Sequence, residues 1–221
     1  MSYLTRVKIC GITSPQDAIT AATYGADAIG MIFYPKSKRY VTAKQAREIT
    51  TAVGPFVNIV ALFVNPTVNE VKQVLEQAQV QTLQFQGDET KEFCEQFSLP
   101  YIKAVKVPSP VKDTEAAISA VQQAIIHEAQ THDSAKAILL DTLHQQHPGG
   151  TGETFDWRCV PVTQQLRWIL AGGLNPANVS DAIQQVKPYA VDVCSGVERE
   201  PGIKDSAKVK AFIENAKSVR H

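Results

Sequence analysis

Short apolar runs alternate with amphipathic stretches along the chain. Eight such runs, bounded by Gly, Pro or Asn, predict β-strands at residues 7–12, 27–34, 57–64, 82–87, 101–107, 137–142, 167–174 and 190–197. Helical spacing follows each run, and capping side chains or first-turn prolines mark several helix starts, at Ser14-Pro15, Asn65-Pro66-Thr67, Asp113-Thr114 and Asn175-Pro176. The pattern predicts strand–helix units throughout, with a short sixth helix near residues 157–165 that Pro161 breaks.

Eight strand–helix units have two main solutions, an open doubly wound sheet and a closed (β/α)8 barrel. The chain has 221 residues, and barrels of this kind commonly occupy about 200–250 residues as one domain. The number of units favours the barrel. We therefore expect an α/β protein in which residues 1–221 form a single-domain (β/α)8 TIM barrel.

Charge and cysteine content narrow the class of partner. Lys+Arg and Asp+Glu both number 22, so no broad positive field favours a nucleic acid or an anionic membrane, and a small-molecule ligand fits better. No apolar run reaches the roughly 18 residues of a membrane span, and the start of the chain does not resemble a signal peptide. Cys10, Cys94, Cys159 and Cys194 lack disulfide or CxxC spacing, so we expect free thiols and a cytoplasmic protein.

Polar and glycine residues cluster where the predicted strands end. They are Cys10, Gly11, Gln86, Gly87, Asp141, Gly172, Gly173, Ser195 and Gly196. Any one of these glycines alone is more simply an ordinary turn residue. Together they indicate a site, because the carboxyl ends of the strands carry the active site of a (β/α)8 barrel.

The first strand, VKICGIT, places Lys8 and Cys10 on one face because strand side chains alternate. A neighbouring ammonium increases the thiolate fraction of a cysteine, so Cys10 is a candidate base. Asp141 follows Ala-Ile-Leu-Leu, and partial burial there would raise its carboxyl pKa toward a value useful for an acid. The alternatives are a buried apolar role for Cys10 and a turn-capping role for Asp141.

Three glycine clusters predict contacts with a phosphate and a closing loop. AGGL at 171–174 and CSGV at 194–197 end the last two strands, where such barrels often bind phosphate through backbone N–H groups. GGTG at 149–152, with His144 and His147 before it, is expected to form a mobile loop that closes over the substrate. A metal site at this histidine pair is the less favoured alternative, because no further ligand has suitable spacing.

Seven motifs occur in the order found in one enzyme family: KICGIT, GADAIGMIF with SKRYV, QFQGDE, LLDT, GGTGETFDW, LAGGLNPANV, and DVCSGVE with PGIKD. On these motifs the chain resembles the phosphoribosylanthranilate isomerase family of tryptophan biosynthesis, over nearly its whole length. The resemblance implies a (β/α)8 fold and an Amadori rearrangement without a cofactor. In that reaction N-(5-phosphoribosyl)anthranilate, an aminoaldose, becomes 1-(2-carboxyphenylamino)-1-deoxyribulose 5-phosphate, an aminoketose.

The resemblance also assigns roles to residues. It implies Cys10 as general base and Asp141 as general acid, with substrate contacts from Arg39, Gln86 and Asp192 and phosphate contacts from Gly172, Gly173, Ser195 and Gly196. The reaction independently needs such a pair, since ring opening requires a proton on the ring oxygen and the next step removes the C2 proton. Arg39 suits the anthranilate carboxylate because a guanidinium matches a carboxylate at two points. Without the resemblance, a solvated basic loop would be the better interpretation of Arg39.

Two departures from the family pattern leave the proposed acid and base unchanged. Gln86 stands where many members have His, and Cys194 where many have Ser. Gln86 can donate and accept hydrogen bonds but carries no proton at neutral pH. Two alternatives stay open: another phosphate-binding barrel, such as an indole-glycerol-phosphate or thiamine-phosphate synthase, and a barrel that binds a phosphorylated ligand without catalysis.

Overall fold

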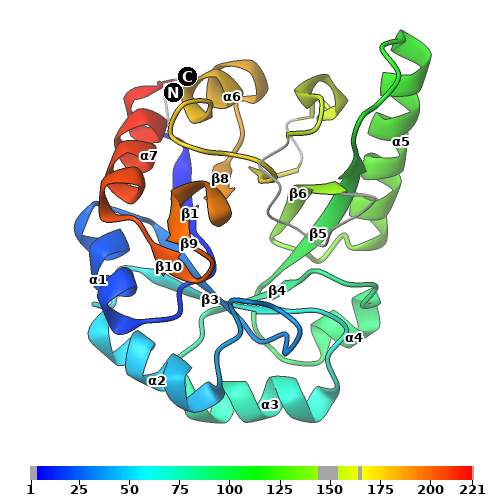
Figure 1. Ribbon diagram of the computed structural model, residues 1–221. Helices are drawn as coiled ribbons and strands as arrows, with labels where there is room; N and C mark the ends of the chain where they lie inside the picture. Colours follow the sequence, from blue (N-terminus) through cyan, green and yellow to red (C-terminus); the bar gives the residue numbers. More distant parts are fainter. Residues whose placement is uncertain (1–3, 144–153, 164–165, 221) are drawn as a thin grey trace.

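A computed structural model describes residues 4–143, 154–163 and 166–220. Eight parallel strands pair in sequence order, and the last pairs with the first, so the sheet is a closed barrel. The strands are β1 (Arg6–Ile9), β2 (Ala28–Ile32), β3 (Asn58–Phe63), β4 (Thr82–Phe85), β5 (Tyr101–Pro108), β6 (Ala137–Leu143), β7 (Trp168–Leu170) and β8 (Ala190–Val193). The barrel predicted from the strand count is confirmed, and the open sheet is excluded (Figure 1).

The helices surround the barrel. They are α1 (Pro15–Thr23), α2 (Ala43–Ala52), α3 (Val68–Gln77), α4 (Lys91–Glu95), α5 (Glu115–Thr131), α6 (Val179–Val186) and α7 (Ser206–Ser218). Ser14, Thr67 and Thr114 cap their helices with a side-chain oxygen, at the positions the sequence indicated. Asn175-Pro176 instead lies in a turn before α6. Between β6 and β7, where a short helix was expected near residues 157–165, the described residues form the 3-10 helix η1 (Trp157–Cys159).

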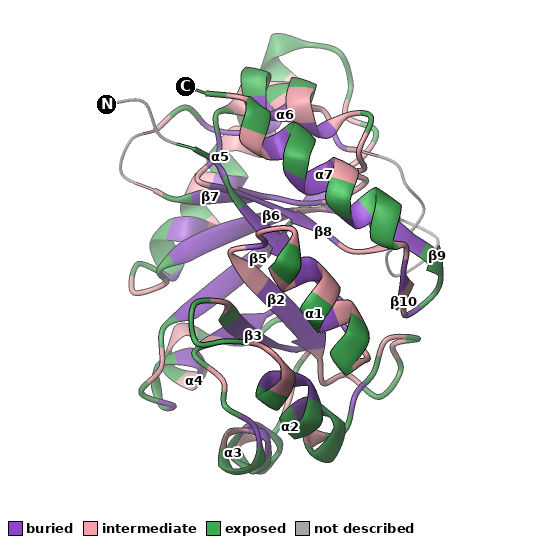
Figure 2. Ribbon diagram, turned by 90° about the vertical axis from the view of Figure 1, so that its left-hand side faces the viewer, coloured by how far each residue is buried: buried purple, intermediate pink, exposed green. Residues whose placement is uncertain are grey.

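Two hydrophobic layers follow from the alternation of the strands. Val7 and Ile9 of β1 face outward into the layer between strands and helices, and Lys8 faces inward. The barrel interior is filled by mostly small apolar side chains: Val60, Ile102, Ala104, Ala137, Leu139, Ile169, Ala171 and Ala190. Figure 2 shows buried strands at the centre and helices whose outer faces are exposed.

A small hairpin after the last barrel strand was not predicted from the sequence. The 3-10 helix η2 (Ser195–Val197) follows β8, and β9 (Glu198–Glu200) then pairs antiparallel with β10 (Ile203–Lys204). The predicted last strand, 190–197, therefore ends at Val193, and its glycine-containing end forms η2. This hairpin brings charged side chains to the carboxyl ends of β1 and β2. In the described part of the chain no helix is long and apolar enough to span a membrane.

Candidate active site

The proposed base lies at the carboxyl end of β1, beside a buried ion pair. Lys8 Nζ donates to Asp192 Oδ1 over 2.9 Å, and both side chains are buried inside the barrel. Burial alone would lower the pKa of Lys8, but Asp192 and Cys10 raise it above its ordinary value. Lys8 is therefore a permanent cation next to the Cys10 thiol.

The Cys10 thiol has a second neighbour, Cys194, which follows β8. A hydrogen bond with the Cys194 thiol and the charge of Lys8 lower the pKa of Cys10 to about 7, although burial opposes them. The same hydrogen bond and burial raise the pKa of Cys194 well above its ordinary value. The thiolate is therefore on Cys10, and Cys194, whose Sγ also lies 3.9 Å from Glu198 Oε1, keeps its proton. Cys194, which stands where many family members have Ser, leaves Cys10 as the proposed base but contacts its thiol directly.

The proposed acid lies on β6, within a row of neutral amides. Gln86 Nε2 donates to Asp141 Oδ2 over 2.9 Å, and Gln84 Nε2 donates to Gln86 Oε1 over the same distance. The other carboxylate oxygen, Oδ1, accepts from the backbone N–H of Thr142 over 3.0 Å. Because Gln stands at position 86 where many family members have His, the side chain that donates to Asp141 is uncharged.

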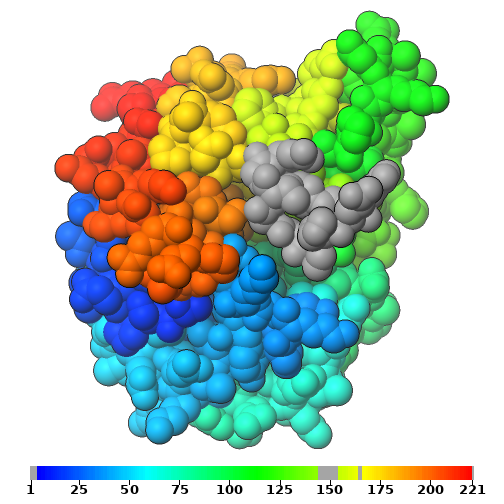
Figure 3. Space-filling model, in the orientation of Figure 1, coloured from blue at the N-terminus to red at the C-terminus, as the bar shows by residue number. Residues whose placement is uncertain are grey.

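Arg39 belongs to a charged network rather than to a solvated loop. Its Nε and one terminal nitrogen donate to the two oxygens of Glu198 over 2.7 and 2.6 Å. Lys204 Nζ donates to the same carboxylate over 3.0 Å and to the Cys194 carbonyl over 3.0 Å. The hairpin therefore fixes the guanidinium at the mouth, and its other N–H donors lie outside this bidentate pair. Figure 3 shows the segment after β2 beside the orange residues that follow β8.

The predicted phosphate residues lie beyond β7 and β8. Gly172 and Gly173 have φ of 75° and 67°, a conformation that favours glycine. Gly196 lies against the Leu174 carbonyl, so the turns after the two strands are in contact, and a side chain at position 196 would separate them. The two glycine turns therefore present adjacent stretches of backbone at the same mouth, together with Ser195.

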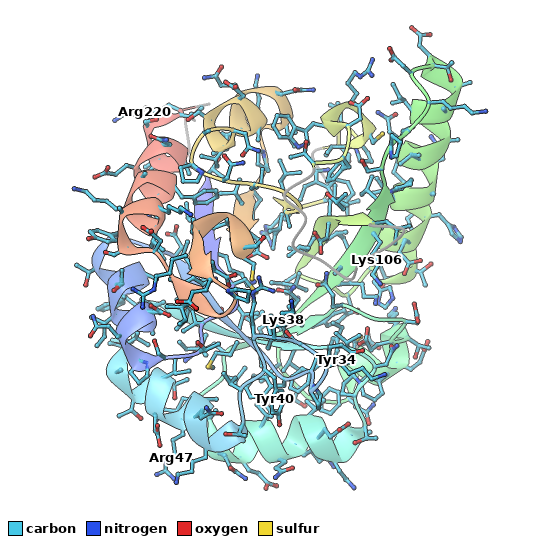
Figure 4. The ribbon with its side chains drawn as sticks, viewed as in Figure 1. Tyr34, Lys38, Tyr40, Arg47, Lys106 and Arg220 are labelled. Atoms are coloured by element: carbon cyan, nitrogen blue, oxygen red, sulfur yellow. The ribbon has the colours of Figure 1, made fainter. Side chains whose placement is uncertain are left out.

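The structure adds residues that the sequence analysis missed. Lys106 is the register partner of Asp141 on β5, and Figure 4 labels it near the centre of the view with Lys38. Glu198 and Lys204 fall inside the motifs DVCSGVE and PGIKD, but nothing along the chain indicated that Glu198 would meet Arg39, which is 159 positions away. Gly30 could have been found only from the structure: a Cβ there would lie 2.8 Å from Cys10 Sγ.

Cys94 on α4 and Cys159 on η1 are free thiols, as expected, and both are buried. The expected closing loop, with His144 and His147, lies outside the described residues. A cavity of about 500 Å³ opens between the ends of β4 and β5 and helix α5; Gln86 and Lys106 line it, but Cys10 does not.

Comparison with known proteins accounts for this arrangement. The family model for N-(5'phosphoribosyl)anthranilate isomerase matches residues 7–215. The chain belongs to the phosphoribosylanthranilate isomerase family. The N-(5'-phosphoribosyl)anthranilate isomerase of Pseudomonas putida (strain GB-1) is 50% identical over 217 residues, 98% of this chain and 99% of the relative. That of Nitrosomonas eutropha is 45% identical over 213 residues, 96% of this chain and 97% of the relative.

Solved structures of phosphoribosylanthranilate isomerases have the same fold. The crystal structure from Thermotoga maritima has a TM-score of 0.82 at 41% identity and covers 98% of this chain and 100% of its own. A second phosphoribosylanthranilate isomerase, in complex with reduced 1-(o-carboxyphenylamino)-1-deoxyribulose 5-phosphate, has a TM-score of 0.75 at 37% identity, with the same coverage. The seven motifs that carried the resemblance therefore identified the family correctly.

We predict that Gly30→Ala damages the site and leaves the fold intact. The added methyl group would lie 2.8 Å from Cys10 Sγ and 2.9 Å from Lys8 Nζ, so one of them must move. Misplacement of a reacting group by about 1 Å can cost about 10²-fold in rate, and we expect a loss of kcat on that scale. Gly54→Ala is the matched control, since no atom lies within 4 Å of its added Cβ. Equal kcat in the two variants would contradict the prediction.

A second prediction separates a thiol from a hydroxyl at position 194. Cys194→Ala removes the donor to Cys10, so the Cys10 thiolate should form at a pH higher than about 7, by about one pH unit. Cys194→Ser keeps a donor, so its midpoint should stay closer to the original. The ultraviolet absorbance of the thiolate against pH measures both midpoints. The same midpoint in Cys194→Ala and the parent chain would show that the hydrogen bond has no effect.

Proposed function

We propose that the chain converts N-(5-phosphoribosyl)anthranilate into 1-(2-carboxyphenylamino)-1-deoxyribulose 5-phosphate, with Cys10 as base and Asp141 as acid. Family membership supports the reaction, and the observation that carries the residue assignment is the thiol of Cys10. That thiol lies beside the Lys8 ammonium at the mouth of the barrel, with its pKa lowered to about 7. At the buried Cys94, by contrast, burial outweighs the charge of Lys103 and raises the pKa to about 12.

The acid and base act in sequence. Asp141 gives a proton to the ring oxygen of the ribose, the C1–O bond breaks, and the anilino nitrogen forms an iminium with C1. The iminium acidifies the neighbouring C2–H, and the Cys10 thiolate removes that proton. The resulting enolamine becomes the ketone when C1 takes up a proton and the C2 hydroxyl loses one. Substrate and product are isomers, so one acid and one base balance the reaction.

The remaining contacts hold the two charged ends of the substrate. Backbone N–H groups at Gly172, Gly173, Ser195 and Gly196 would bind the phosphate, which needs no lysine there. Arg39 would bind the anthranilate carboxylate, because Glu198 and Lys204 hold the guanidinium in place before substrate arrives.

Two substrate contacts fall inside the barrel mouth. Asp192 would meet the ribose-derived hydroxyls with the carboxylate oxygens that remain available beside its bond to Lys8. Gln86 would contact the substrate from the acid's side, since its amide already bonds Asp141. The other phosphate-binding barrels considered above do not account for a thiolate at Cys10. We propose a cytoplasmic location, which the four free cysteines support.

The acid–base pair makes a direct prediction. Cys10→Ser and Asp141→Asn should each lose about 10²–10⁴-fold in kcat, because neither new side chain replaces the proton transfer. In the parent chain kcat/KM should fall as the pH drops through about 7, where the Cys10 thiolate takes up a proton. Growth of a tryptophan-requiring cell that lacks this isomerase should be restored by the parent chain and by neither variant. Near-normal turnover of folded Asp141→Asn would return Asp141 to its turn-capping role.

A further prediction concerns substrate binding. Arg39→Ala should raise KM roughly 10- to 100-fold with some turnover retained, since a sheltered charge-assisted hydrogen bond contributes about 1.5–3 kcal/mol. Glu198→Gln should raise KM by less, because it loosens the guanidinium but keeps it. Lys36→Ala, an exposed cation in the same loop, is the control and should leave KM unchanged. If Arg39→Ala and Lys36→Ala had the same KM, Arg39 would not bind the carboxylate.

A further inference from the structure

A glutamine inside the barrel has no evident structural reason to be there. Gln84 lies on β4 between Leu83 and Phe85, which face the outer hydrophobic cluster, so Gln84 faces the interior. It is 1% exposed, and its register partners are the apolar Leu62 and Ile102. Its amide oxygen Oε1 is buried and has no hydrogen-bond partner among the described residues. Buried polar groups are normally satisfied, so an apolar side chain of this size would be less costly here.

The other end of the same amide has a defined partner. Gln84 Nε2 donates to Gln86 Oε1 over 2.9 Å, and Gln86 Nε2 donates to Asp141 Oδ2 over 2.9 Å. Both bonds point toward Asp141. Gln86 is an ambivalent neighbour for a carboxyl group, because rotation of its amide by 180° would present Oε1 to Asp141 instead of an N–H. The bond from Gln84 occupies Oε1, so Gln86 can turn without losing this bond only if Gln84 turns with it.

We propose that Gln84 is a positioning residue of the isomerase reaction, which fixes the direction of the Gln84–Gln86–Asp141 hydrogen-bond chain so that Gln86 always donates to the acid. A donor on Oδ2 stabilises the carboxylate that remains after Asp141 has given its proton. A chain of aligned hydrogen bonds also strengthens each member. This inference rests on the proposed role of Asp141 as the acid and adds a residue that does not touch the substrate.

The other charged groups near Asp141 are the same in the parent chain and in a variant at position 84. Lys106 on β5 is its register partner, and the neighbouring strand β7 carries no titratable side chain between Trp168 and Leu170. Across the mouth lie the Lys8–Asp192 pair and Cys10. Replacement of Gln84 by Leu adds or removes no charge, so its effect on Asp141 must pass through the amide of Gln86 or through local packing.

The test is a pH titration of the Asp141 carboxyl in the full chain, monitored by carbon-13 NMR of protein labelled at aspartate. The signal of Asp141 is assigned by its loss in Asp141→Asn. Gln84→Leu removes the donor to Gln86 and keeps a similar volume. We expect the Asp141 midpoint to move to higher pH, kcat to fall, and KM to change little. We also expect Gln84→Leu to unfold at no lower denaturant concentration than the parent, because the unpaired amide oxygen is gone.

A second variant reverses the chain. In Gln84→Glu the new carboxylate only accepts, so Gln86 must turn its N–H toward position 84 and its oxygen toward Asp141. Asp141 must then keep a proton to donate, so its midpoint should rise further than in Gln84→Leu. Gln81→Leu is the matched control: it removes a glutamine immediately before the same strand, whose Oε1 accepts from the Ile59 N–H over 2.7 Å. This control should leave the Asp141 midpoint unchanged.

The outcomes distinguish the positioning role of Gln84 from the assignment of Asp141 as the acid. An unchanged Asp141 midpoint in folded Gln84→Leu, or a shift equal to that of Gln81→Leu, overturns the positioning role. Normal turnover in Asp141→Asn would overturn the assignment of the acid, whereas a shifted midpoint in Gln84→Leu would still establish the hydrogen-bond chain. A loss of kcat in Gln84→Leu with an unmoved midpoint would show a packing effect and would also overturn the proposal.

Discussion

The pairing of β1 with β8 closes the barrel, and the catalytic arrangement depends on it. Its register sets Lys8 beside Asp192, two residues 184 positions apart whose charges are both buried. Loss of one partner of such a pair costs about 3–5 kcal/mol, because it leaves an uncompensated charge inside the protein. The same closure brings Cys10 next to Cys194, so the ion pair that joins the ends of the sheet also provides the environment of the base.

The two halves of the site use different electrostatics. On the base side, Lys8 favours the Cys10 thiolate, and Arg39 is held nearby by Glu198. On the acid side, two neutral groups donate to Asp141, the Gln86 amide and the backbone N–H of Thr142. An uncharged amide neither takes nor gives a proton at neutral pH, so it does not compete with the acid for one. This separation suits a reaction that needs a thiolate and a protonated carboxyl group in one small space.

Local signals were reliable for the elements and less so for their ends. All eight strands appear where apolar runs predicted them, because the alternation of side chains on a strand is a local property. The predicted strand at 167–174 ends at Leu170, since Gly172 and Gly173 adopt positive φ and leave the extended conformation. The hairpin that contains Glu198 and Lys204 was missed, because its strands are only three and two residues long.

The sequence by itself determined the barrel, the order of its strands and, through its motifs, the family and the expected acid and base. Apolar periodicity and capping residues act within a few positions, so they can be read along the chain. Only the tertiary structure decided which groups surround those residues: Cys194 against Cys10, Glu198 on Arg39, and Gln86 on Asp141. These contacts depend on strand register and barrel closure, which set distances between residues remote in the sequence, and no local pattern encodes such distances.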